Sequence, residues 1–311
     1  KAKYITQTEC DSLKQIPIQL DYHRVDHKLG IAPYFREYLR KTLQAKEPKR
    51  KNYASWQLKP YGQYYLDSLE WENNPLYGWI EKNPKADGSK YDIYHDGLKI
   101  YTTIDARMQR YAEQAVEEHF TDMQAKFMKT LKYKKNPPFA NNTLQEDVDR
   151  SLNQAMRQCD RYRNLKKEKK TEAEIKESFN TPTEMTVFSY KGQIDTVMTP
   201  MDSIRYHKAF ARCGMMSIDP ITGHVKAYVG GPDFTYFQYD MVNQGRRQVG
   251  STIKPYLYSL AMSEGYWPCD TTINQPITLY DKLGREFTPR NDSQKQLGET
   301  VTLRWGLQNS N

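Results

Sequence analysis

The spacing of apolar residues changes along the chain, and it predicts helices in some segments and strands in others. From residue 106 to about residue 120, apolar side chains recur every three or four positions, which is typical of a helix with one buried face. We expect that core face to consist of Met108, Tyr111, Ala112, Ala115, Val116 and His119 or Phe120. A second helical face is expected from Leu152, Ala155, Met156, Cys159 and Tyr162.

Other segments alternate between apolar and polar residues, which is the pattern of strands. A strand is expected at residues 98–103, and residues 185–198 predict a hairpin that turns at residues 190–193. Residues 215–229 predict a second hairpin, which turns through residues 219–223. The pattern by itself therefore predicts a mixed protein in which helices accompany antiparallel strands.

Residues 1–96 have the character of a connector. They are rich in Tyr, Pro and Asn, and only short pieces such as residues 34–43 show a weak helical period. His23 and His27 are four residues apart and could share a helical face, yet Arg24 stands where a zinc protease would have glutamate. We expect no metal site here and no cofactor in the chain as a whole.

Positive charge is concentrated in one segment. The formal net charge is +8, and residues 121–170 contain 13 Lys and Arg against 6 Asp and Glu, an excess of seven. With a capping box from Thr171 to Glu174, this predicts a basic helical insertion at about 121–180. A solvated helical face is the plain interpretation, and an anionic membrane, a glycan or a partner protein are the alternatives. The chain has no recognisable nucleic-acid-binding motif, so no nucleic acid is expected as a partner.

Composition narrows the class further. Hydrophobic residues make up 38% of the chain, which is enough to build a core. The longest mainly apolar run, residues 257–262, is far shorter than the roughly 20 residues that a membrane-spanning helix needs. Four cysteines, at positions 10, 159, 213 and 269, have no C-x-x-C spacing. That spacing argues against a metal site and leaves both disulfides and free thiols open.

A serine and a lysine three residues apart carry the clearest chemical signal. Ser251 and Lys254 follow Gly250, and Pro255 comes next, where the first turn of a helix tolerates proline. Residues i and i+3 share a helical face, so the lysine amine could take the serine proton and leave the oxygen nucleophilic. Free N–H groups of a first turn would stabilise the oxyanion formed after attack. An ordinary helix cap at Ser251 is the alternative, and the flanking segments decide between the two.

Those flanking segments resemble one family. Residues 216–231 read MSIDPITGHVKAYVGG, residues 97–105 read GLKIYTTID, and residues 289–291 and 301–304 read PRN and VTLR. These segments are similar to those that surround the nucleophile in class A penicillin-binding proteins, which are bifunctional peptidoglycan synthases. Residues 3–13 resemble the helix that ends the glycosyltransferase domain of the same proteins.

The resemblance implies an α+β fold, the penicillin-recognising serine transpeptidase fold, with helices packed on an antiparallel sheet. Residues 97–311 would be the first part of this domain, truncated at the C-terminus, and residues 1–96 a linker after a missing glycosyltransferase domain. The third family motif, K-T-G, does not occur, so we expect the 311 residues alone to be inactive. The implied location is periplasmic or extracytoplasmic, anchored to the inner membrane through an N-terminal part absent from the chain.

The resemblance also assigns roles to three residues. Ser251 would attack the D-Ala-D-Ala end of a peptidoglycan stem peptide and form an acyl-enzyme, and Lys254 would take its proton. Ser310, the serine of the second family motif S-x-N, would relay a proton to the departing D-alanine, while Asn311 receives no role. β-Lactams would acylate Ser251 in the same way, and proteins of the divisome or elongasome are further expected partners.

Two other functions compete with this one. A D,D-carboxypeptidase or a β-lactamase-like hydrolase would use the same serine and lysine with water as the acceptor. A non-catalytic module that docks a membrane or a divisome partner would need none of the three site residues. The intact Ser251, Lys254 and Ser310, together with the long connector, favour the synthase.

Overall fold

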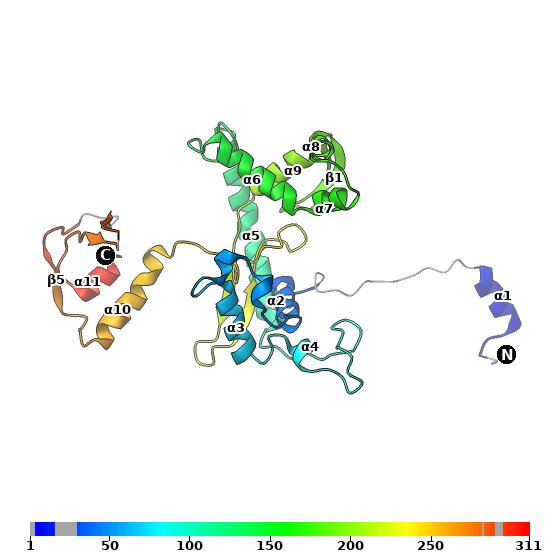
Figure 1. Ribbon diagram of the computed structural model, residues 1–311, viewed down its shortest axis with the longest axis horizontal. Coiled ribbons are helices and arrows are strands. Elements are labelled where there is room, and N and C mark those ends of the chain that lie inside the picture. Colours follow the sequence, from blue (N-terminus) through cyan, green and yellow to red (C-terminus); the bar gives the residue numbers. More distant parts are fainter. Residues whose placement is uncertain (1–3, 16–29, 282, 290–294) are drawn as a thin grey trace. The chain divides into compact units, whose positions relative to one another are not determined.

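The computed structural model describes residues 4–15, 30–281, 283–289 and 295–311, which form two compact units, Lys1–Gly245 and Arg246–Asn311 (Figure 1). His23, His27, Arg290 and Asn291 lie outside the described residues. In chain order, with η for a 3-10 helix, the first unit contains α1 (Gln7–Gln15), α2 (Pro33–Leu43), η1 (Arg50–Asn52), η2 (Ser55–Leu58), α3 (Gln63–Asn73), α4 (Trp79–Lys82), α5 (Ala106–Leu131), α6 (Gln145–Gln158), α7 (Asp160–Lys167), α8 (Glu172–Asn180), β1 (Thr183–Val187), β2 (Ile194–Met198), α9 (Pro200–Lys208), β3 (Met215–Ile218) and β4 (Val225–Val229). The second contains η3 (Gly250–Ile253), α10 (Lys254–Ser263), β5 (Thr271–Ile273), β6 (Leu279–Tyr280), β7 (Glu286–Phe287), β8 (Thr300–Thr302) and α11 (Leu303–Gln308).

The α+β prediction is confirmed, and every strand pairing among the described residues is antiparallel. Both predicted hairpins form, as β1 with β2 and β3 with β4. The turn of the second hairpin is held by Asp219, whose Oδ1 accepts hydrogen bonds from the backbone N–H groups of Ile221 and Thr222 at 2.9 and 3.1 Å. Gly223 ends that turn with a φ of 71°, a conformation that glycine adopts without strain. In the described part of the chain, the strands form four separate two-stranded sheets.

Helix α5 forms as predicted but is longer, with 26 residues, and Asp105 caps its start. The predicted core face is only partly right. Ala112 and Val116 are buried against β4, whereas Tyr111 is 63% exposed and Met108 is 38% exposed. Ala115 and His119 are also exposed, and Phe120 is partly buried. The buried face is rotated relative to the predicted one because Gln109 lies on it. Hydrophobic spacing cannot predict a buried glutamine.

Gln109 is fully buried and pairs with the backbone of β4. Its Nε2 donates to the carbonyl of Tyr228 at 3.0 Å, and its Oε1 accepts from the N–H of Tyr228 at 2.7 Å. The side-chain amide thus satisfies both backbone groups of one strand residue, as a neighbouring strand would. Gln124, further along α5, binds the loop that follows α9 in a similar way. Its side chain donates to the carbonyl of Ala209 and accepts from the N–H of Ala211. Two polar side chains therefore fix α5 to the segments it covers.

The strand expected at residues 98–103 does not form. This segment instead runs beside β4 with isolated contacts, because Thr103 donates its hydroxyl to the carbonyl of Val225 at 2.8 Å. The N–H of Asp105 donates to the carbonyl of Lys226 at 2.9 Å. These two bonds place the start of α5 over β4 without a continuous ladder of backbone pairs.

Part of the expected connector belongs to the core of the first unit. Tyr34 of α2 is 3% exposed, packs edge-on against Phe234, and donates its hydroxyl to the carbonyl of Phe237 at 2.6 Å. Burial raises the pKa of the Tyr34 phenol above its usual value, so the side chain stays neutral and serves as a donor. Helix α2 is therefore a structural part of this unit and contacts β4.

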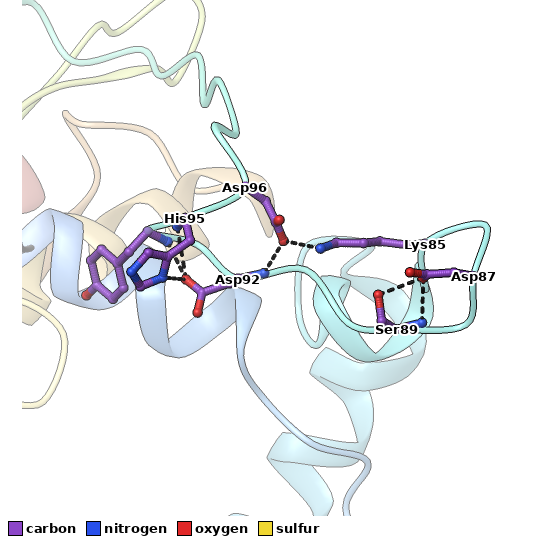
Figure 2. A network of polar contacts seen from close by, with 7 residues as sticks. Lys85, Asp87, Ser89, Asp92, His95 and Asp96 are labelled. Carbon is purple, nitrogen blue, oxygen red and sulfur yellow. Dashed lines mark hydrogen bonds and ion pairs between the residues drawn. The ribbon is translucent and has the colours of Figure 1, made fainter.

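A loop at residues 83–97 follows α4 and is closed by polar contacts, which Figure 2 shows. The Lys85 ammonium lies 2.6 Å from Asp96 Oδ2, and the same oxygen accepts from the N–H of Asp92 at 2.6 Å. Asp92 Oδ1 in turn accepts from the N–H groups of Tyr94 and His95. These contacts close the loop before the segment 98–105 that leads into α5.

Helices α6 to α9 form a small core of their own. Met156, Ile175 and Phe179 are buried together, with Cys159 and Tyr162 packed against them. The capping box at Thr171 is confirmed. Residues of the second predicted face do pack on the core, but they are divided between α6 and α7, because the backbone of Cys159 is extended between these helices. Among the described residues, no helix is apolar and long enough to span a bilayer, and all four cysteines carry free thiols.

His207 lies in a cluster of aromatic rings and should make the stability of this unit depend on pH. Its Nδ1 lies 2.8 Å from the Ser203 carbonyl, and its ring stacks on Tyr236. Burial lowers the pKa of His207 and the nearby Arg212 lowers it further, while the Ser203 carbonyl acts in the opposite direction. Below about pH 6.5, the unfolded chain binds a proton that the folded chain takes up less readily. The free energy of unfolding is thus expected to fall as the pH drops from 7.5 to 5.5.

Urea unfolding at these two pH values measures the effect. His207→Gln should reduce the loss of stability at low pH, whereas His224→Gln, at an exposed histidine, should leave it unchanged. Equal pH dependence in the two variants would contradict the assignment to His207.

Candidate active site

The three predicted site residues all lie in the second unit. Ser251 is in η3, Lys254 is the first residue of α10, and Ser310 follows the end of α11 by two residues. In this unit β5 pairs with β8, so that Thr271 lies opposite Thr302 and Ile273 lies opposite Thr300. The pairing brings the segment before α11 next to the one that follows α10, so the chain returns toward the start of α10 at Ser310.

Ser251 lies in a 3-10 turn and not in the first α-helical turn that the sequence suggests. Gly250 opens the turn with a φ of 53°, and Pro255 occupies the first turn of α10. In a 3-10 turn, side chains at i and i+3 eclipse each other, so the expected common face of Ser251 and Lys254 is kept. Ser251 is exposed, and in the described part of the chain no hydrogen bond joins its hydroxyl to Lys254. Ser251 is therefore accessible to solvent.

Lys254 and Ser310, which are 56 residues apart in sequence, are in direct contact. Lys254 Nζ donates to Ser310 Oγ at 3.1 Å and also to the Ser310 carbonyl. Ser310 has a φ of 58°, a left-handed conformation that costs a non-glycine residue about 1–2 kcal/mol. Contacts of Ser310 and of the next residue, Asn311, offset this cost.

Four hydrogen bonds hold the turn that carries Ser310. The N–H of Ser310 donates to the Leu307 carbonyl at 3.2 Å, and the N–H of Asn311 donates to the Gly306 carbonyl at 2.8 Å. Tyr258 of α10 donates its hydroxyl to the Asn311 carbonyl at 3.2 Å. The Asn311 side chain donates from Nδ2 to Asn274 Oδ1 at 2.9 Å. Sequence reasoning gave Asn311 no role and did not single out Tyr258 or Asn274, because no local motif marks them.

The arrangement can support nucleophilic chemistry with proton transfer. An exposed hydroxyl lies one 3-10 turn before an amine, and that amine contacts a second hydroxyl. Such a set can take a proton from an attacking serine and return it to a leaving group. The described residues contain no group of three or more His, Cys, Asp and Glu side chains that could hold a metal ion.

Comparison with known families gives two adjoining matches. The family model described as "Penicillin-binding protein middle domain" matches residues 134–211, and that described as "Penicillin binding protein transpeptidase domain" matches residues 213–311. The first match includes most of the basic helical segment that the sequence led us to expect at about 121–180. The second contains Ser251, Lys254 and Ser310.

Curated relatives give the same picture over more of the chain. Penicillin-binding protein 1A of Escherichia coli is 24% identical over 341 residues, with 98% of this chain and 34% of the relative covered. Penicillin-binding protein 1A of Aquifex aeolicus is 28% identical over 289 residues, which cover 89% of this chain and 35% of the relative. The chain thus spans about a third of the length of these relatives.

Among solved structures, the crystal structure of Penicillin-Binding Protein 1A from Haemophilus influenzae matches with a TM-score of 0.45 and 18% sequence identity. The match covers 98% of this chain and 41% of that one. The two family matches and the curated relatives agree with the motifs around Ser251. This chain belongs to the class A penicillin-binding proteins, and the models of their middle domain and transpeptidase domain match its residues 134–211 and 213–311.

Proposed function

We propose that the protein containing this chain is a peptidoglycan D,D-transpeptidase that works through an acyl-enzyme on Ser251. One observation supports this most strongly: Lys254 Nζ lies 3.1 Å from Ser310 Oγ, and Ser251 precedes Lys254 by one 3-10 turn. Two motif residues that are 56 positions apart are thus in contact, one turn after the candidate nucleophile. A penicillin-binding family background makes stem peptides and β-lactams the natural ligands of such a site.

In the proposed reaction, Ser251 Oγ attacks the carbonyl carbon between the two terminal D-alanines, and its proton passes to Lys254. The new C–O bond forms as the C–N bond breaks, and the departing D-alanine leaves as an amine after taking a proton through Ser310. An amine of a second stem peptide then attacks the ester and releases Ser251. Each proton taken from a nucleophile is returned to a leaving group, so the cycle needs no cofactor.

The remaining parts of the proposal concern the whole protein. The chain spans about a third of its relatives. For the protein that contains it, we propose what class A membership implies: a peptidoglycan glycosyltransferase activity, a periplasmic location and an inner-membrane anchor. These attributes rest on family membership and not on any residue of the site.

We propose that the basic side chains of α6 to α8 mainly form a solvated surface. Several of their cations already pair with acidic neighbours, such as Lys166 with Glu172 at 2.6 Å and Arg150 with Asp147 at 2.9 Å. Exposed pairs of this kind contribute little to stability and remain open to exchange. An anionic membrane, a glycan or a divisome or elongasome protein is the partner that this surface would attract.

Labelling with a fluorescent penicillin tests the proposed function. A protein that extends this chain to the length of its relatives should gain one adduct per molecule by intact mass, and the adduct should decay slowly. Rapid loss of the adduct would indicate a β-lactamase-like hydrolase in which water is the acceptor. The 311-residue chain, which has no K-T-G motif, should label much more weakly. A folded, extended protein that forms no adduct would overturn the proposal in favour of a docking module.

A further inference from the structure

We propose that Asn274 is a positioning residue that holds Ser310 against Lys254. This inference rests on the proposed function, because it concerns the placement of a proton-relaying hydroxyl. Asn274 directly follows β5, and among the described residues it makes no hydrogen bond to Ser310 or Lys254. It acts through Asn311, the neighbour of Ser310.

Asn274 is held in one orientation by its surroundings. It is 7% exposed, and its Nδ2 donates to the carbonyls of Lys295 and Gln296 at 3.0 and 3.1 Å. Its backbone N–H donates to the Glu299 carbonyl at 2.9 Å, and its own carbonyl accepts from Gly298 at 2.7 Å. Both amide protons and both backbone groups are therefore in use. The side-chain oxygen has a fixed direction, and it receives the hydrogen bond from Asn311 Nδ2 at 2.9 Å.

Asn311 is also anchored from the opposite side. Tyr258 donates to its carbonyl, and Tyr258 lies four residues after Lys254 on the same face of α10. Gly306 lets this contact form, because a Cβ at that position would collide with the Tyr258 hydroxyl. Helix α10 therefore presents Lys254 to Ser310 and Tyr258 to Asn311, while Asn274 fixes the Asn311 side chain.

This double anchorage adds to the two backbone hydrogen bonds, from Ser310 to Leu307 and from Asn311 to Gly306, that hold Ser310 in its left-handed conformation. A serine with a φ of 58° would relax to a common conformation if the next residue were free, and its hydroxyl would then turn away from Lys254. With Asn311 also held by Asn274 and Tyr258, that relaxation would break two hydrogen bonds in addition to those of the backbone. The placement of Ser310 thus depends on Asn274, which lies 37 positions before Asn311 in sequence.

Two variants in the extended protein test the proposal. Asn311→Ala removes the link to Asn274 and keeps every contact that Asn274 makes with its own loop, so the fold should persist. We expect its acylation by a β-lactam to slow about fivefold, the change typical of one lost hydrogen bond. Asn274→Ala should slow acylation at least as much, and the double variant no more than Asn274→Ala alone, because both act through one contact. Asn309→Ala is the matched control, since Asn309 is exposed and bonds only within α11.

Hydrogen exchange supplies a readout that does not require activity. In Asn274→Ala, the amides of Ser310 and Asn311 should lose protection, while those of the β5 and β8 pairing should keep it. Unchanged protection at these two amides, or wild-type acylation by Asn311→Ala, would overturn the role of Asn274. Failure of the proposed function has a different signature, because wild-type protein would then form no adduct while the exchange experiment would still decide on Asn274.

Discussion

Replacement of Ser251 with alanine is expected to abolish covalent labelling by a fluorescent penicillin in the extended protein. The acyl bond needs an oxygen at this position, and the exposed 3-10 turn offers that oxygen directly to the ligand. The fold should not change, since the Ser251 hydroxyl makes no hydrogen bond in the described part of the chain. Intact mass after incubation measures the result, with loss of the adduct as the expected outcome.

Ser259→Ala is the control for this experiment. Ser259 lies on α10, is exposed, and bonds only the Pro255 carbonyl at 2.7 Å. Its replacement should leave labelling unchanged. A stoichiometric adduct that survives in Ser251→Ala would show that another residue is the nucleophile, and the roles of Lys254 and Ser310 would fall with it.

The second large effect is expected in the first unit, where Gln109→Ala should lower the free energy of unfolding by about 3 kcal/mol. The substitution leaves the N–H and the carbonyl of Tyr228 without their partner, and each unpaired buried group costs about 1–3 kcal/mol. Urea unfolding followed by circular dichroism measures the change, with the transition of this unit analysed separately from that of the second.

Gln114→Ala provides a matched comparison on the same helix. Gln114 is exposed and bonds Glu118, so the same change in side chain occurs without burial. Its effect should stay within about 0.5 kcal/mol. Equal effects of the two substitutions would mean that Gln109 is not the residue that fixes α5 to β4.

The two hairpins, α5, and the helices after it could be predicted because their signals are local. Alternation of apolar residues and a turn at residues 219–223 are sufficient to define β3 and β4. The predicted strand at 98–103 did not form for the converse reason, since the side chain of Gln109 already pairs with the backbone of Tyr228 in its expected partner β4. Pairing depends on what else reaches the strand edge, and that is decided far along the chain.

The sequence by itself determined the family, the α+β class, and the candidate nucleophile with its lysine, because Ser251 and Lys254 are related by one turn of helix. Only the tertiary structure decided which residues hold the site and the core in place. Asn274 reaches Asn311 across 37 residues, and Gln109 reaches Tyr228 across 119. Buried polar side chains of this kind follow no hydrophobic period, and their value comes from backbone groups that would otherwise lie unpaired.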